Sequence, residues 1–174
     1  GFHPDGSLIL GRLRRPGTRT NRMLDLLKQQ VADLRSHGIN RNFPTEHDQL
    51  YFEKLLGYLN GHGVTPVIVM NPLQPQLFAE LQRQHDPRRV WALNYLRQLH
   101  TRYRFDFIDL TDIRTFGGSP LEFSDPTHVS TANMRLMLAY IVKHDNGILE
   151  DDRPILVHRY VCIIAFLPLF WLRV

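Results

Sequence analysis

An acid and an imidazole stand three residues apart in the segment from Phe123 to Val129, as Asp125 and His128. A histidine that accepts a proton from a nucleophile needs a carboxylate to orient its ring, and a rigid turn can hold the two groups together. The pair therefore predicts general-base activation of a hydroxyl. An ordinary turn with a capping aspartate is the alternative interpretation of the same residues.

The elements around this segment follow an α/β pattern. Residues 65–70 form a short apolar run between turn-forming residues, which is typical of a strand buried on both faces of a parallel sheet. Residues 105–110 predict a second strand. Because ligands bind beyond the carboxyl ends of parallel strands, the loops that begin at Asn71 and Thr111 should open on the same edge as the Asp125/His128 turn.

Helices are predicted on both sides of these strands from apolar residues at three- and four-residue spacing. They cover residues 20–37, 45–61, 76–84, 87–103 and 129–144, with Thr45 as an N-cap for the second and Gly38 after the first. Strands alternating with helices, without hairpin signals, predict a doubly wound α/β sheet. A short strand is also expected at residues 8–10.

The Asp-x-x-His block of Asp125 and His128, placed just before the last helix, resembles the SGNH (GDSL-type) hydrolases. The resemblance spans residues 1–148 and implies a three-layer flavodoxin-like parallel sheet flanked by helices. It implies that His128 is the general base toward a serine, that Asp125 orients it, and that no cofactor is needed. The implied function is an ester hydrolase or O-acyl transfer domain acting on a small acyl ester or an acylated glycan or lipid.

Two blocks of that family are missing from the sequence. No Gly-Asp-Ser tripeptide is present, and Asp5-Gly6-Ser7 has similar letters in another order, so Ser7 is not the expected nucleophile. The chain starts with Gly1 rather than Met and shows no signal peptide, which predicts an upstream part that carries the nucleophile strand. Without a Gly-x-Asn-Asp block, Asn71 either donates to an oxyanion or simply starts a turn.

The composition argues against nucleic acid and metal ions as ligands of this chain. The net charge is +4, and five arginines (Arg12, Arg14, Arg15, Arg19 and Arg22) lie close together near the start. A solvated loop leading into a helix explains them better than nucleic-acid binding, because no aromatic residues are interleaved for base stacking. The single Cys162 excludes a cysteine zinc site, and no histidine or carboxylate cluster has metal-ligand spacing.

Residues 149–174 form an apolar tail outside the α/β pattern. Its apolar stretch, residues 160–172, is shorter than the roughly 17–25 residues of a membrane-spanning helix. A buried strand, an interfacial anchor and sequence foreign to the domain are all open interpretations, and with them membrane association or a cell-envelope location.

The alternative function is a catalytically inactive SGNH-like binding or scaffold module. The missing serine favours that alternative, and the retained Asp125/His128 pair argues against it.

Overall fold

The computed structural model describes the backbone of residues 16–39, 42–144 and 163–166. It describes the side chains of residues 21–39 and 42–144. The helices confirm the five predicted segments with three ends shifted by more than one residue: the first helix starts four residues earlier than expected, the fourth ends four residues earlier, and the last starts two residues later. They are α1 (Pro16–His37), α2 (Glu46–Gly61), α3 (Pro75–Arg83), α4 (Pro87–Leu99) and α5 (Thr131–His144), with a short 3₁₀ turn η1 (Ile113–Phe116). The strands are β1 (Val67–Met70), β2 (Asp106–Asp109), β3 (Phe123–Asp125), β4 (His128–Val129) and β5 (Ile163–Phe166).

The helix boundaries follow from local chemistry. Thr45 caps α2 in a reciprocal box: the Asp48 N–H donates to Thr45 Oγ1 at 3.2 Å, and the Thr45 N–H donates to Asp48 Oδ2 at 2.9 Å. At the end of α1, Gly38 adopts a left-handed φ of 75°, the conformation that terminates helices and favours glycine. Both predicted boundary residues are confirmed.

Strand β1 lies at the centre of the main sheet. It pairs in parallel with β2 on one edge, through Val67 opposite Asp106, and with β5 on the other, through Val67 opposite Ile163. All of its residues are buried, which confirms the predicted parallel strand. In the part of the chain that the structure describes, the fold is thus mixed helix and strand, broadly α/β, with two small sheets.

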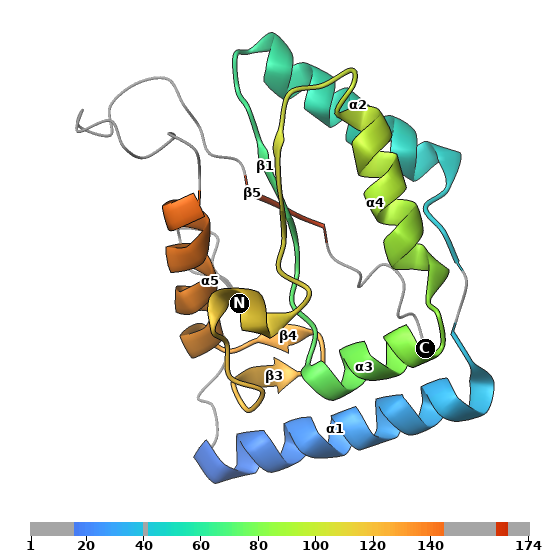
Figure 1. Ribbon diagram of the computed structural model, residues 1–174, viewed down its shortest axis with the longest axis vertical. Helices are drawn as coiled ribbons and strands as arrows, with labels where there is room; N and C mark the ends of the chain where they lie inside the picture. Colours follow the sequence, from blue (N-terminus) through green and yellow to red (C-terminus); the bar gives the residue numbers. More distant parts are fainter. Residues whose placement is uncertain (1–15, 40–41, 145–162, 167–174) are drawn as a thin grey trace, which may run out of the picture.

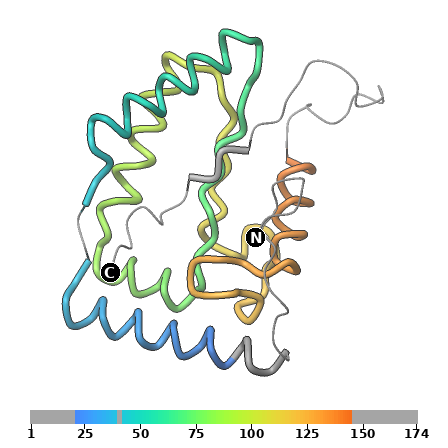
Figure 2. The backbone as a smooth tube through the Cα atoms, turned by 180° about the vertical axis from the view of Figure 1, so that it is seen from behind, coloured from blue at the N-terminus to red at the C-terminus, as the bar shows by residue number. Residues whose placement is uncertain are grey.

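The core divides into two clusters because alternate residues of β1 point to opposite faces. Val67 and Val69 pack with residues of α1, α3 and α5, whereas Ile68 packs with residues of α2 and α4. Figure 1 shows α2 and α4 along one flank of β1 and β2, α5 along the other, and α1 with α3 at the end where these strands finish. Figure 2 shows the same arrangement from behind.

The expectation of no hairpin is wrong at one place. β3 and β4 pair antiparallel around a two-residue turn of Pro126 and Thr127, with Asp125 directly opposite His128. Strands of three and two residues are too short for apolar alternation to reveal them, because the alternation signal needs about four residues or more. The hairpin is the element that carries the predicted acid and imidazole.

Part of the tail also has a place in the fold. Ile163–Phe166 forms β5 beside β1, as the buried-strand interpretation of the tail requires for these residues. The rest of residues 149–174 lies outside the described residues, as do Ser7 and the strand expected at residues 8–10. In the described ranges, no helix combines the length and apolar character needed to cross a membrane.

Candidate functional site

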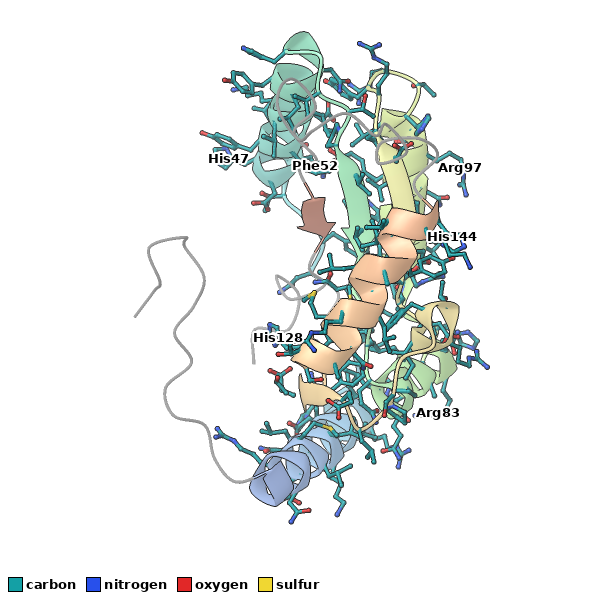
Figure 3. The ribbon with its side chains drawn as sticks, turned by 90° about the vertical axis from the view of Figure 1, so that its left-hand side faces the viewer. His47, Phe52, Arg83, Arg97, His128 and His144 are labelled. Atoms are coloured by element: carbon teal, nitrogen blue, oxygen red, sulfur yellow. The ribbon has the colours of Figure 1, made fainter. Side chains whose placement is uncertain are left out.

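Asp125 and His128 contact each other across the hairpin. Asp125 Oδ2 lies 2.7 Å from His128 Nδ1, with the imidazole 52% exposed and the carboxylate 34% exposed. A two-residue turn places its flanking residues side by side on one face of the ladder, so the three-residue spacing in sequence becomes a direct contact. Figure 3 shows His128 at the end of α5 that lies nearer to α1.

The second carboxylate oxygen holds the turn itself. Asp125 Oδ1 accepts hydrogen bonds from the Thr127 N–H at 2.9 Å, the Thr127 hydroxyl at 2.9 Å and the His128 N–H at 3.0 Å. This is the turn in which an aspartate side chain accepts from the backbone two residues onward. The two oxygens of Asp125 therefore have separate tasks: Oδ1 fixes the loop and Oδ2 orients the ring.

These contacts set the protonation of the pair. Burial alone would raise the pKa of Asp125, but the Thr127 N–H, the His128 ring and the Thr127 hydroxyl outweigh it and lower that pKa below its usual value. An ionised carboxylate only accepts hydrogen bonds, so a neutral His128 carries its proton on Nδ1. Nε2 then presents a lone pair, and it has no hydrogen-bond partner within the described ranges.

Three loops meet around the hairpin, as the sequence predicts for the carboxyl edge of a parallel sheet. The Leu73 N–H, in the loop after β1, donates to the Thr111 carbonyl beyond β2 at 3.1 Å. The next residue, Gln74, donates its N–H to the Pro126 carbonyl at 2.9 Å. The Asp125/His128 turn is thus fastened directly to the loop after β1, and through that loop to the loop after β2.

Asn71, the candidate oxyanion donor, starts the loop after β1 at this edge. Its side chain is half-buried and makes no hydrogen bond with any described residue, Asp125 and His128 included. The structure therefore brings Asp125 and His128 together and places Asn71 on the same edge without joining it to them. Ser7 lies outside the described residues.

A buried amide that sequence analysis did not single out joins α5 to the loop that precedes the hairpin. Asn133 of α5 is fully buried; it accepts from the Ser119 N–H at 2.8 Å and donates to the Ser119 carbonyl at 2.9 Å. The Ser130 hydroxyl donates to Glu122 at 2.5 Å at the start of the same helix. Asn133 lies on the same buried face of α5 as Met137 and Ile141, and a polar residue at such a position was the signal in the sequence for a buried hydrogen-bonding role.

The two glycines before the hairpin are explained by backbone conformation at the first and by close packing at the second. Gly117 ends η1 with a left-handed φ of 71°, and a Cβ on Gly118 would lie 2.6 Å from the Phe116 ring. The left-handed φ and the close approach of the ring both favour glycine.

No group of three histidine, cysteine or carboxylate side chains that could hold a metal occurs among the residues that the structure describes.

No protein-family model matches this chain, and no curated protein or solved structure matches it either.

Proposed function

We propose that this chain is the α/β domain of an SGNH-like ester hydrolase or O-acyl transferase that uses His128 as general base and Asp125 as its orienting acid. The observation that carries the proposal is the 2.7 Å contact between Asp125 Oδ2 and His128 Nδ1 with Nε2 left unengaged by the described residues. The three-layer flavodoxin-like sheet belongs to the same proposal. It is supported by the parallel β1–β2 pair with helices packed on both faces.

The proposed reaction begins at a serine outside the described residues. His128 Nε2 takes the hydroxyl proton as the serine oxygen attacks the acyl carbonyl, and Asp125 stabilises the resulting imidazolium. The imidazolium then gives its proton to the departing alcohol, leaving an acyl-serine. Water or a second alcohol attacks that acyl group with the same base, which yields the free acid or the transferred ester.

The proposed substrate is a small acyl ester or an acylated glycan or lipid. The 52% exposure of the His128 side chain supports access by a bulky acceptor. The amide of Asn71, without a hydrogen bond to any described residue, is the proposed donor to the oxyanion.

One observation favours the alternative of an inactive binding or scaffold module. Asp125 Oδ1 accepts three hydrogen bonds that stabilise the turn, so this aspartate has a structural reason to be present without catalysis. The His128 ring has no such reason, because its only hydrogen-bond partners among the described residues are Asp125 and Thr127. His128 is accordingly the residue that distinguishes the two functions.

The test is covalent labelling of the natural protein with a fluorophosphonate, which loses fluoride to an activated serine. We expect one adduct by intact mass, located on a serine by peptide mapping, and loss of the adduct in His128→Ala. His144→Ala is the matched control, because His144 is exposed and its Nδ1 contacts only the Tyr140 carbonyl, at 2.9 Å.

Three outcomes separate the alternatives. Labelling lost in His128→Ala but kept in His144→Ala supports the hydrolase. Labelling equal in the parent and in His128→Ala excludes His128 as the base. A parent protein that takes no label and hydrolyses no short-chain ester supports the inactive module instead.

A further inference from the structure

A groove of about 820 Å³ runs between α1 and α3, and neither Asp125 nor His128 lines it. Its accessible apolar lining includes Val31, Ala32 and Ala79, and its cationic side chains are Lys28, Arg35 and Arg83. Figure 3 shows Arg83 and His128 on different sides of the molecule. The groove is therefore separate from the site proposed above.

A buried carboxylate holds two of the cations in place. Glu80 has a side chain only 3% exposed, and it accepts from Arg35 Nε at 3.1 Å and from Arg83 Nη2 at 2.5 Å. Gln84 Nε2 donates to the same carboxylate at 2.8 Å. A buried carboxylate with several donors is a fixed anchor, so the guanidinium groups it binds have restricted positions.

The arginines retain donors that this anchor does not use. Their side chains are 64% and 62% exposed, and Arg35 bonds Glu80 through Nε alone, which leaves both its terminal amino groups without a partner among the described residues. Arg35, Arg83 and Lys28 outnumber the single carboxylate of Glu80, so the groove carries a net positive charge. Guanidinium groups in this state match the geometry of carboxylate and phosphate oxygens.

We propose that this groove binds a long-chain alkyl anion. The carboxylate or phosphate head lies against Arg35 and Arg83, and the alkyl chain lies along Val31, Ala32 and Ala79. A volume of about 820 Å³ falls within the range of small-molecule sites, about 300–1,000 Å³. The combination of apolar wall and cationic rim requires a ligand that is both apolar and anionic.

The experiment is calorimetric titration of the whole chain with four probes below their micelle concentrations: dodecanoate, dodecyl phosphate, neutral dodecyl maltoside and inorganic phosphate. The first two should bind, the neutral probe should bind at least about tenfold more weakly, and inorganic phosphate should not bind measurably. The two anionic probes distinguish the carboxylate from the phosphate head. Equal binding of the neutral and anionic probes would overturn the proposal.

Variants locate the site. Arg35→Gln and Arg83→Gln should each weaken binding about tenfold or more, since each removes a charge-assisted hydrogen bond. Ala79→Glu should do the same by placing a carboxylate in the groove. Arg97→Gln is the control, because Arg97 is an exposed arginine of α4 that bonds Asn94 at 2.7 Å, far from the groove lining.

Circular dichroism melting confirms that each variant folds. Unchanged affinity in folded Arg35→Gln and Arg83→Gln, or no measurable binding of dodecanoate and dodecyl phosphate to the parent chain, would contradict the assignment. His128→Ala should leave these affinities unchanged, so failure of the hydrolase proposal and failure of the groove proposal give different results.

Discussion

Gln74 donates its backbone N–H to the Pro126 carbonyl at 2.9 Å, which fastens the start of α3 to the turn between Asp125 and His128. The Gln74 side chain also accepts from the Gln76 N–H at 2.7 Å as the helix cap. One residue therefore orders both the first turn of α3 and the position of the hairpin. The bond belongs to the backbone, so only a change that removes the N–H tests it.

Gln74→Pro should disturb the His128 ring more than Gln74→Ala does. The φ of Gln74 is −58°, which proline can adopt, so the substitution removes the donor without forcing the backbone. Gln74→Ala removes the cap but keeps the N–H. We expect the imidazole resonances of His128 in ¹H–¹⁵N spectra to move in the proline variant and to stay near their parent values in the alanine variant. Equal shifts in both would show that the backbone bond does not position the ring.

Asp125→Asn should allow His128 to change tautomer. The carboxylate can only accept from Nδ1, whereas the asparagine amide can also donate to it, which moves the ring proton to Nε2. Long-range ¹H–¹⁵N correlation would show Nε2 as the protonated nitrogen in the variant. If the natural protein takes the fluorophosphonate, its esterase kcat should fall by about 10⁴ in this variant. A ring that keeps its proton on Nδ1 would contradict the orienting role of Asp125.

The lowered pKa of Asp125 predicts a stability change with pH. Because its folded pKa lies below the unfolded value of about 3.9, the stabilisation is complete above that value and is lost as the pH falls below it. The ¹³C shift of the Asp125 carboxyl, followed on acidification, should titrate at lower pH than that of an unstructured aspartate. A titration at or above about 3.9 would contradict the hydrogen bonding described for Oδ1.

Thr127→Val should destabilise the hairpin without removing the ring contact. The Thr127 side chain is buried, and its hydroxyl donates to Asp125 Oδ1 at 2.9 Å. Loss of one such bond costs about 0.5–1.5 kcal/mol and should raise the pKa of Asp125 toward its usual value. Urea unfolding measures the first effect and carboxyl titration the second. Thr127→Ser, which keeps the hydroxyl, should restore the parent pKa.

Glu80 provides a second acid-sensitive contact. Hydrogen bonds from Arg83, Gln84 and Arg35 hold the pKa of Glu80 at about 2, well below its usual range. Its contribution to stability is therefore complete above the unfolded pKa of about 4.3 and is lost as the pH falls toward 2. Glu80→Gln should lower the Tm at pH 7 and reduce the loss of Tm between pH 5 and pH 3. An unchanged acid profile in this variant would contradict the assignment.

The sequence predicted those features that depend on local chemistry. Thr45 and Gly38 mark helix boundaries through side-chain capping and a left-handed φ, and both act over a few residues only. The buried run of β1 was recognisable because a strand covered on both faces has no polar alternation. The contact of Asp125 with His128 could be predicted because residues three apart in sequence face each other across a tight turn.

Features that depend on distant partners could not be predicted. The side chain of Asn133 is explained only by Ser119, fourteen residues earlier, and Glu80 is buried only because Arg35 and Arg83 converge on it. The hairpin was missed because β4 contains only His128 and Val129. The number of strands in the main sheet could not be predicted either, since a pattern of strands and helices specifies the order of elements but not how many strands join one sheet.

The position of β1 has a consequence for how this protein behaves at high concentration. Both edges of that apolar strand are paired, one with β2 and one with β5, so its backbone offers no template for intermolecular cross-β association. On β2, the outer strand among the described residues, Asp106 is exposed, whereas Asp109 forms an ion pair with Arg89. An exposed charged residue on an outer strand discourages addition of a strand from another molecule, so we expect Asp106 to oppose fibril growth on this side.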